Sequence, residues 1–478
     1  MIQILLADVA FAMGATTMRC SPGLVVAGEV VHDSRSVRSG DLCFAIRGET
    51  YDGHDFAAAA LAAGAVAVVV DNPQVAQHLT GPTLLVADAV TALGALAASV
   101  VRRIKGIQVV AITGSSGKTT TKDLLAAVLA RFGETIGPTG SFNNDVGLPM
   151  TVLSVTAQTR YLVLEMGARA RGDIARLCQV AQPDVGVVLN VGSAHEGEFG
   201  SRTATAAAKA ELVHDLTATG VAVLNADDPL VAAMSEITRA RVISFGMSAA
   251  ADVRMSEMTL DTRARPTVLA HFGNEVVRVS LLVSGAHQVA NAAAVLAAGL
   301  ALGLPLNDLA AALARAQVSS RWRMEVAETA AGTVVINDAY NANPESVAAA
   351  LRALVAIAAG RTSWALLGEM RELGDLSEAA HSQAGGLAVE LGVDHVVAIG
   401  AGARPLAEGA LAANRGLAGS TSVSVSWLRD ADAALAFVAG QVRPQDVVLV
   451  KASRAVALER LAADLIATQG GRQESVID

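Results

Sequence analysis

Residues 107–133 contain a short apolar strand, a turn rich in glycine and serine, and an amphipathic helix, with the sequence IQVVAITGSSGKTTTKDLLAAVLARFG. The strand is Ile107–Thr113, and the helix stops at Gly133. The apolar residues of the helix recur at spacings that place them on one face: Leu124, Leu125, Val128, Leu129 and Phe132. A strand, a glycine loop and a helix in this order are the context that a phosphate-binding loop requires. The segment therefore predicts an α/β domain that holds a phosphate at the carboxyl end of a sheet.

The loop is built from the residue types that bind a triphosphate. It comprises Thr113, Gly114, Ser115, Ser116, Gly117, Lys118, Thr119 and Thr120. Glycines let backbone N–H groups crowd round a phosphate, and the start of a helix adds partial positive charge. We expect Lys118 to reach the outer phosphates and the Thr119 hydroxyl to face Mg²⁺. The usual spacing GxxxxGK[ST] is not met, because Ile112 stands where its first glycine belongs. A tight strand-to-helix turn that binds nothing is the alternative.

Strand-like runs alternate with alanine-rich helical stretches along most of the chain. Besides 107–113, the predicted strands are 161–165, 184–190, 221–225, 333–338, 363–368, 393–400 and 446–450. This alternation is typical of parallel α/β sheets, and a chain of 478 residues is too long for one ordinary core. We predict three α/β domains, at 1–104, 105–318 and 319–478, the central one a parallel sheet with the phosphate loop and the last one Rossmann-like.

The charge of the chain excludes one class of partner. Acidic residues outnumber basic ones 45 to 36, whereas nucleic-acid binding needs a basic surface. We therefore expect no nucleic acid, and any anionic ligand must be held by a local cluster of positive groups. The three cysteines show no metal-ligand spacing, and they are typical of small buried residues in a reducing compartment. The first residues lack a basic region and carry Asp8, and no apolar stretch is long enough for a bilayer, so we expect a cytoplasmic chain without membrane insertion.

Two polar residues follow predicted strands downstream of the loop. Glu165 closes the strand YLVLE, and His195 comes shortly after the strand that ends at Asn190. Because ligands gather at the carboxyl ends of strands in an open α/β sheet, both side chains are candidates to face Lys118 and serve Mg²⁺. A solvated carboxylate and a helix-capping histidine are the alternatives.

Lys209 lies on an apolar helical stripe. In TATAAAKAELVHDL it shares one face with Ala206, Val213 and Leu216, at spacings of three and four residues. Such a lysine either extends its ammonium group to solvent or has a specific role. The residues alone leave both interpretations open.

The third block supplies candidates for a nucleoside contact. The sequence TVVINDAYNANPES ends a strand and then presents Asp338, Tyr340 and Asn341, while Asn343 and the following proline are typical of a helix start. Upstream, Asn291 belongs to the helix that GAHQVANAAA opens. The segment SSRWRMEV places Arg321 and Arg323 near the predicted joint between the second and third blocks.

The N-terminal block contains a dense group of polar, basic and turn residues. Ser34, Arg35, Arg47 and His54 lie among glycine turns in HDSRSVRSGDLCFAIRGETYDGHDF. An anion pocket and a solvated loop are both compatible with this pattern.

Taken together, these segments resemble the Mur ligase family, which adds amino acids to the peptidoglycan precursor in the bacterial cytoplasm. The resemblance covers nearly the whole chain, in order, through the following motifs: DSR…GDxF…DGHDF at 33–56, TGSSGKT-TK at 113–122, NNDxGxP at 143–149, EMG at 165–167, NxxxAHxxxFGS at 190–201, KAEL at 209–212, LNADD at 224–228, GAHQVANAAA at 285–294, DAYNANP at 338–344 and GEMRELG…H at 368–381.

Within the family, the segments SFNNDVGLP, DAYNANP and GEMRELG are similar to those of the member that adds the dipeptide D-alanyl-D-alanine. Earlier Mur ligases and folylpolyglutamate synthetase are the alternatives within this group of ligases. A phosphate-loop NTPase switch is the alternative from another class, although it leaves Lys209 and the DAYNANP segment without a role.

The resemblance implies roles for individual residues. It implies that Lys118 and Thr119 hold the triphosphate and Mg²⁺, that Glu165 and His195 serve Mg²⁺, and that Lys209 is carbamylated to an anion that also serves Mg²⁺. Asn291, Asp338, Tyr340 and Asn341 match contacts to adenine and ribose, and Arg323 or Arg321 matches an arginine near the phosphates. Ser34, Arg35, Arg47 and His54 match the domain that binds the UDP-sugar, and Asn143 and Asn144 match substrate positions. Lys451 and Arg454 match the family's KGSR, with Ala452 in place of its glycine.

The implied reaction uses ATP and Mg²⁺. The carboxylate of UDP-N-acetylmuramoyl-tripeptide becomes an acyl phosphate, which the amine of D-alanyl-D-alanine then attacks. We expect these two substrates as the partners, and a monomer.

Overall fold

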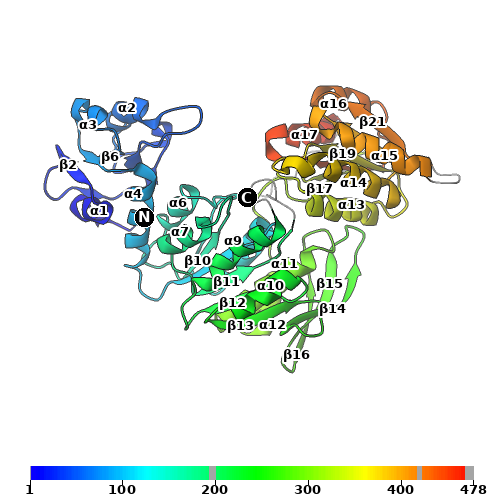
Figure 1. The fold of residues 1–478 in the computed structure, drawn as a ribbon, viewed down its shortest axis with the longest axis horizontal. Coiled ribbons are helices and arrows are strands. Elements are labelled where there is room, and N and C mark those ends of the chain that lie inside the picture. Colours follow the sequence, from blue (N-terminus) through cyan, green and yellow to red (C-terminus); the bar gives the residue numbers. More distant parts are fainter. Residues whose placement is uncertain (1, 193–200, 417–421, 469–478) are drawn as a thin grey trace.

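The computed structural model describes residues 2–192, 201–416 and 422–468. It contains three α/β units in chain order, built on sheets of five, nine and six strands. Figure 1 shows the N-terminal unit in blue and the C-terminal unit in yellow to red at the two ends of the view, with the central unit below and between them. Among the described residues, no helix combines the length and apolar character that crossing a membrane requires.

The N-terminal unit has a five-stranded sheet with the order β2–β7–β6–β5–β4, parallel except for the β2–β7 pair. Its strands are β2 (Thr16–Met18), β4 (Val30–Val31), β5 (Leu42–Phe44), β6 (Ala67–Val70) and β7 (Thr83–Leu85), and β1 (Ile4–Leu5) pairs separately with β3 (Val25–Val26). Its helices are α1 (Leu6–Met13), α2 (Ala57–Ala62), α3 (Pro73–His78) and α4 (Ala89–Val101), with short 3₁₀ turns at Ser34–Ser36 and Gly53–Phe56. The Asp88 carboxylate caps α4 by accepting from the Thr91 N–H at 2.6 Å.

The central sheet has the order β16–β15–β14–β13–β12–β11–β8–β10–β9. Its strands are β8 (Gln108–Thr113), β9 (Thr135–Ile136), β10 (Tyr161–Glu165), β11 (Val185–Val188), β12 (Val221–Asn225), β13 (Arg241–Gly246), β14 (Val253–Leu260), β15 (Pro266–Phe272) and β16 (Glu275–Ser280). Its helices are α5 (Lys118–Leu129), α6 (Gly147–Val152), α7 (Asp173–Val180), α9 (Arg202–His214), α10 (Pro229–Ala232), α11 (Gln288–Ala301) and α12 (Leu306–Leu313), with a 3₁₀ turn at Ala233–Glu236.

The prediction of parallel pairing is confirmed for the part of this sheet around the phosphate loop. Strand β8 lies between β10 and β11, and all three are parallel. The outer part of the sheet differs from the prediction, because β14, β15 and β16 form antiparallel pairs. Buried and partly buried residues alternate along most of β15, as is usual for an antiparallel strand with one face nearer to solvent.

The cores on the two faces of the central sheet have different neighbours. On one face, the β8 residues Val109 and Ala111 pack in a cluster that includes Leu93 and Leu96 of α4, so the N-terminal unit shares its core with this face. On the other face, Val110 packs with residues of α5 and α11. The phosphate-loop helix therefore packs on this face of the sheet, beside α11.

The C-terminal unit has a six-stranded sheet with the order β17–β18–β22–β19–β20–β21, parallel except for the β17–β18 pair. Its strands are β17 (Glu325–Glu328), β18 (Val334–Asn337), β19 (Ser363–Gly368), β20 (His395–Ile399), β21 (Ser424–Leu428) and β22 (Val447–Lys451). Its helices are α13 (Pro344–Ala358), α14 (Ser377–Glu390), α15 (Arg404–Gly416), α16 (Ala431–Ala439) and α17 (Glu459–Thr468), with 3₁₀ turns at Gly374–Leu376, Ala401–Ala403 and Arg454–Val456. Separate apolar clusters cover the two faces of this sheet, as predicted for a Rossmann-like unit.

Candidate active site

A cleft of about 800 Å³ lies between the phosphate loop and the C-terminal unit. The central unit contributes the loop residues Ser115–Thr120, the segment Asn143–Val146, Glu165 and Asn291. The C-terminal side contributes Arg323, Asp338, Tyr340, Asn341, Lys451 and Arg454. Most of the side chains predicted for nucleotide binding are therefore brought to one cavity from segments far apart in the sequence.

The phosphate loop is shaped by close packing at a glycine and by one asparagine. Gly117 has a φ of 81°, and a Cβ at this position would lie 2.5 Å from Asn291 Oδ1, so only glycine fits. Asn190 Oδ1 accepts hydrogen bonds from the N–H groups of Ser115 at 3.0 Å and Ser116 at 2.9 Å. The backbone N–H groups of Ser115 and Ser116 thus donate within the protein. A bound phosphate would accept from the backbone N–H groups that follow them in the loop.

Lys118, Thr119 and Glu165 meet at the carboxyl end of the sheet. Lys118 Nζ donates to the Gly114 carbonyl at 2.7 Å, and the pKa of Lys118 is lowered because burial disfavours its charged form. The Thr119 hydroxyl donates to the buried Glu165 carboxylate at 2.8 Å. Asn143 Nδ2 donates to the other oxygen of that carboxylate, also at 2.8 Å. The site therefore presents a buried anion beside a hydroxyl and a lysine.

The other residues predicted in or near the loop do not all face the cleft. The Thr113 hydroxyl is buried and donates to the Met166 carbonyl at 2.9 Å, so it fastens the end of β8 to the segment after β10. Thr120 lines the cleft, whereas Thr113 and Gly114 are absent from its described lining. Asn144 accepts from the N–H groups of Val146 and Gly147 and caps the start of α6.

Lys209 lies on α9 and does not extend to solvent, since only 2% of the residue is exposed. Burial and the nearby positive charge of Lys118 lower the pKa of Lys209 to about 7. Lys209 is absent from the described lining of the cleft. The interpretation of Lys209 as an exposed lysine on an apolar stripe is therefore wrong. His195, the other predicted metal-site residue, lies outside the described residues.

An ion pair organises the C-terminal wall. Lys451 Nζ donates to the Asp338 carboxylate at 2.6 Å and to the Asn341 carbonyl at 2.8 Å. The other oxygen of Asp338 accepts from the Met324 N–H at 3.1 Å. Asp338 thereby joins β18, β22 and the segment that enters this unit.

Arg323 lines the cleft, whereas Arg321 is exposed and does not. The guanidinium of Arg323 lies over the Tyr340 ring, 4.2 Å from its centroid. The Tyr340 hydroxyl shares a hydrogen bond with Ser141, which belongs to the central unit. Of the two arginines left open by the sequence, Arg323 is therefore the one that lines the cleft.

Asn291 lies beneath the phosphate loop. Its Oδ1 accepts from the Thr121 hydroxyl at 3.2 Å, and its Nδ2 donates to Gln288 at 2.8 Å. Asn291 also lines the cleft. The Asn291 amide therefore makes hydrogen bonds within the protein and also faces the cleft.

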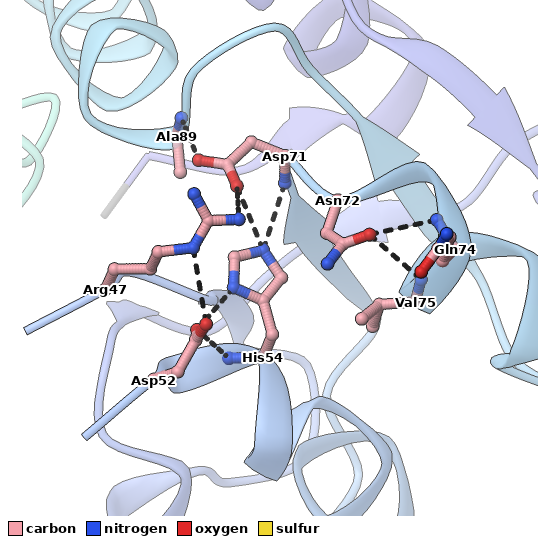
Figure 2. Close-up of polar contacts among 8 residues, drawn as sticks. All are labelled: Arg47, Asp52, His54, Asp71, Asn72, Gln74, Val75 and Ala89. Atoms are coloured by element: carbon pink, nitrogen blue, oxygen red, sulfur yellow. Dashed lines mark hydrogen bonds and ion pairs between the residues drawn. The ribbon is translucent and has the colours of Figure 1, made fainter.

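Two of the N-terminal candidates, Arg47 and His54, belong to one polar network (Figure 2). His54 is buried, its Nδ1 lies 2.6 Å from the Asp52 carboxylate, and its Nε2 accepts from the Asp71 N–H at 3.2 Å. The Arg47 guanidinium contacts the carboxylates of both aspartates, at 3.3 Å from Asp52 and 3.2 Å from Asp71. Asp71 in turn accepts from the Ala89 N–H at the start of α4. The histidine therefore braces the loop that carries Arg47, and its ring nitrogens are occupied.

Arg35 and Ser34 lie on a separate turn. The Arg35 guanidinium donates to Asp33 at 2.7 Å, and its side chain is 89% exposed. Ser34 is the first residue of the same 3₁₀ turn. Neither these two residues nor Arg47 and His54 contribute to the described lining of the cleft, so the N-terminal candidates form a separate place on the molecule.

Asn190 and His287 line the cleft, and neither of them was given a role from the sequence. Asn190 ends a predicted strand and opens the motif NxxxAHxxxFGS, but it received no role, although its side chain holds the phosphate loop. His287 lines the cleft, and burial lowers its pKa to about 4. The motif GAHQVANAAA contains His287, and its place just before Asn291 is the signal that was available.

Comparison with protein families covers most of the chain. A model of the Mur ligase family catalytic domain matches residues 28–108, one of the Mur ligase middle domain matches residues 112–299, and one of the Mur ligase glutamate ligase domain matches residues 322–454. The three matches follow one another in the order of the three sheets.

Individual relatives align over nearly the full length. The chain is 44% identical to UDP-N-acetylmuramoyl-tripeptide–D-alanyl-D-alanine ligase of Mycobacterium tuberculosis strain H37Rv, over 98% of each protein. It is 33% identical to the Bacillus subtilis protein of the same name, over 91% of this chain and 93% of the relative. Crystal structure I of MurF from Acinetobacter baumannii is similar with a TM-score of 0.87 and 32% identity, over 97% of this chain and 99% of that one. MurF ligase from Thermotoga maritima in complex with ADP is similar with a TM-score of 0.78 and 29% identity, over 93% of this chain and 98% of that one.

Proposed function

The chain belongs to the Mur ligase family, and we propose that it uses ATP to join the tripeptide carboxylate of UDP-N-acetylmuramoyl-tripeptide to D-alanyl-D-alanine in peptidoglycan synthesis. The observation that carries this proposal is the cleft in which the phosphate loop faces the C-terminal wall, in a chain similar over 98% of its length to a ligase of that name. The products are ADP, phosphate and the UDP-N-acetylmuramoyl-pentapeptide. We assign the reaction to the cytoplasm and to a monomer.

ATP is assigned to the cleft beside the phosphate loop. A solved relative, the Thermotoga maritima MurF ligase, is a complex with ADP. Ser115–Thr120 would hold the triphosphate, with Lys118 supplying positive charge, while Thr113 and Gly114 shape the start of the loop. Asn291, Asp338, Tyr340 and Asn341 would contact the nucleoside, since the last three stand opposite the loop on the C-terminal wall.

Mg²⁺ fits the donors at the end of β10. The Glu165 carboxylate is buried, and its hydrogen bonds come from two neutral donors, Thr119 and Asn143. Hydroxyl and carboxylate oxygens are ligands that Mg²⁺ prefers. Thr119 and Glu165 would hold the ion, with His195 assigned to it by the family motif alone. Bound Mg²⁺ would supply positive charge to the triphosphate.

Lys209 is proposed to be carbamylated. An amine adds to CO₂ only in its neutral form, and a pKa of about 7 gives a substantial neutral fraction near neutral pH. The ammonium group first loses one proton to give the neutral amine. This amine then forms an N–C bond to CO₂ and releases a second proton, so a buried cation becomes an anion. That anion, close to the positive charge of Lys118, would complete the donors for Mg²⁺.

The chemistry takes place in two steps at the cleft. A carboxylate oxygen of the tripeptide attacks the γ-phosphorus of ATP and expels ADP, which gives an acyl phosphate. The amine of the dipeptide then attacks the carbonyl carbon, loses a proton, and expels phosphate. The attacking carboxylate and the triphosphate repel each other. Lys118 and Arg323 act by offsetting the negative charge at the point where these two substrate groups meet. The C-terminal wall would limit the access of water to the acyl phosphate.

The three units divide the work. We assign UDP-sugar recognition to residues 1–104 through Ser34, Arg35 and Arg47, with His54 as the internal brace of that loop. Residues 105–318 would bind ATP, with Asn143 and Asn144 facing the acceptor substrate. Residues 319–478 would bind the incoming dipeptide and close on the nucleotide.

A product assay tests the proposal. The protein is incubated with ATP, Mg²⁺, a UDP-muramoyl tripeptide ending in lysine or diaminopimelate, and one of several dipeptides or amino acids, and the products are identified by mass spectrometry. We expect a pentapeptide product with D-alanyl-D-alanine, and ADP release that depends on both peptide substrates. ADP release without them would instead support an NTPase switch, and addition of a single amino acid would support an earlier ligase of the family.

A further inference from the structure

Two adjacent charged residues on the phosphate-loop helix have no part in the reaction described above. Lys122 and Asp123 follow Lys118 on α5 by about one helical turn, and they are only 1% and 4% exposed. Lys122 Nζ lies 2.5 Å from Asp123 Oδ1. Charged groups are rarely buried this completely unless they are paired. The best-supported role of a buried ion pair is to hold the surrounding chain in one specific arrangement.

Asp123 also binds the segment that joins the central and C-terminal units. Its Oδ2 accepts from the Ser320 N–H at 2.9 Å, and its Oδ1 accepts from the Ser319 hydroxyl at 3.1 Å. These serines lie between the end of α12 at Leu313 and the start of β17 at Glu325. One carboxylate therefore fastens the interdomain linker to the phosphate-loop helix.

Lys122 fastens a second segment to the same point. Its ammonium donates to the carbonyls of Pro138 at 2.6 Å and Gly140 at 2.9 Å. The loop that follows carries Ser141, which shares a hydrogen bond with Tyr340 of the C-terminal unit. The pair thus connects the phosphate-loop helix, one wall of the cleft and the linker.

The linker leads directly to Arg323 through an unfavourable backbone. Trp322 has a φ of 60° and Met324 a φ of 52°, which are left-handed conformations that residues other than glycine rarely adopt. Such conformations persist where neighbouring contacts hold them. Here the Trp322 carbonyl accepts from the Tyr340 N–H, and the Met324 N–H donates to Asp338. The position of Arg323 between them depends on a linker that is fixed at both ends.

We infer that Asp123, held in place by Lys122, is a positioning residue that sets Arg323 against the phosphate loop. The inference rests on the proposed ligation, because in that reaction Arg323 offsets the negative charge of the phosphates. It predicts that loosening the linker lowers the rate of the chemical step while the phosphate loop still binds ATP.

The test compares three variants of the full-length protein. Asp123→Asn weakens both bonds to the linker, Ser319→Ala removes one of them without disturbing the buried pair, and Ser154→Ala is the control. Ser154 is an exposed serine whose hydroxyl binds only the Thr151 carbonyl, outside the cleft. For each variant we would measure kcat, the KM for ATP, the melting temperature, and acrylamide quenching of the fluorescence of Trp322. The Trp322 contribution is the part that disappears when each measurement is repeated in a Trp322→Phe background.

Loosening the linker should lower kcat by about tenfold or more for Asp123→Asn, because small displacements of a positioned group are costly, with a smaller loss for Ser319→Ala. The KM for ATP should stay within about twofold, and quenching of Trp322 should rise in both variants. If kcat and quenching match those of Ser154→Ala, the inference is overturned, even where the melting temperature falls. If Asp123→Asn yields no folded protein, Ser319→Ala decides by the same two measurements. Should the parent protein fail to ligate, the proposed function fails, while the quenching still reports whether Asp123 holds the linker.

Discussion

The hydroxyl of Thr119 donates a 2.8 Å hydrogen bond to the carboxylate of Glu165. This contact joins the first turn of α5 to the last residue of β10, and β10 runs parallel to β8, the strand that enters the phosphate loop. It places a buried anion at the same sheet edge as Lys118, whose pKa the Glu165 charge raises against the larger opposite effect of burial. The electrostatic balance among these groups is the basis of the first prediction.

Replacing Lys118 with alanine should abolish most ligation and leave the fold intact. The ammonium rests on the Gly114 carbonyl and faces the cleft, so the side chain contributes charge there more than packing. Loss of one group that stabilises transition-state charge typically lowers the rate on the order of 10²–10³. The measurement is the rate of ADP release at saturating ATP, with the melting temperature as the control. Activity within a few-fold of the parent protein would remove the phosphate loop from the mechanism.

Replacing Arg35 with alanine should raise the KM for the nucleotide sugar far more than the KM for ATP. Arg35 is highly exposed, its bonds go to the neighbouring Asp33, and it does not line the cleft. Its removal should therefore not disturb the site of ATP. Steady-state kinetics with each substrate varied in turn measures the two constants. Equal changes in both, or no change in either, would mean that the sugar is bound elsewhere.

Replacing His54 with alanine should destabilise the N-terminal unit. The change leaves the partly buried N–H of Asp71 without its acceptor and deprives Asp52 of its contact with the ring, at a cost of about 1–3 kcal/mol. Urea unfolding measures the loss in free energy of unfolding. His78→Ala, at an exposed position on α3, is the matched control and should change that free energy little. A His54→Ala protein as stable as the parent, with only the KM for the sugar altered, would indicate direct contact with substrate.

Local patterns predicted the parts of the fold that depend on neighbouring residues. The spacing of apolar residues in 107–133 predicted β8 and α5, and the strands 161–165, 221–225 and 363–368 agree with the structure residue for residue. The same patterns missed β14–β16, because an antiparallel pair at a sheet edge has one face in solvent and carries a weaker apolar signal.

The site depends on contacts that no local pattern encodes. Asp123 binds Ser320 across 197 residues, and Lys451 binds Asp338 across 113. His54 is of a residue type expected in a binding loop, yet it is buried, because Asp52 and Asp71, which contact its two ring nitrogens, come from different turns of the chain. The motifs therefore indicated which residues matter, while the packing decides whether each meets the cleft or supports a residue that does.

The lowered pKa of Lys209 predicts how stability depends on pH when CO₂ is excluded. In the unfolded chain this lysine holds its proton up to its ordinary pKa of 10.5, whereas in the folded protein it loses the proton near pH 7. Between these values the unfolded state binds more protons, so the free energy of unfolding rises with pH. The rise should be absent in Lys209→Met. Urea unfolding of both proteins between pH 7 and 9, in CO₂-free buffer, measures the difference, and parallel curves would show that the amine keeps its proton in the fold.

Carbamylation of Lys209 predicts a specific pattern among its substitutions. The adduct would make this position an anion at the Mg²⁺ site, so Lys209→Ala should be severely impaired. Lys209→Arg should be impaired nearly as much, because guanidinium keeps its positive charge and does not form the adduct. A small carboxylic acid added to the alanine variant should restore part of the activity by returning an anion to the vacated space.

A lysine that serves only as a buried cation near Lys118 predicts the reverse pattern. Arginine would then be tolerated as far as its size allows, and the added acid would have no effect on the alanine variant. The rate of ligation by the two variants, with and without acetate at constant ionic strength, separates the two cases. The parent protein under the same acetate serves as the control for a general effect of the salt. The acid can act only on a variant that lacks the lysine side chain, so restored activity would locate the missing negative charge at position 209. An active Lys209→Arg protein would rule out the carbamate. It would leave the assignments of Lys118 and Glu165 unchanged.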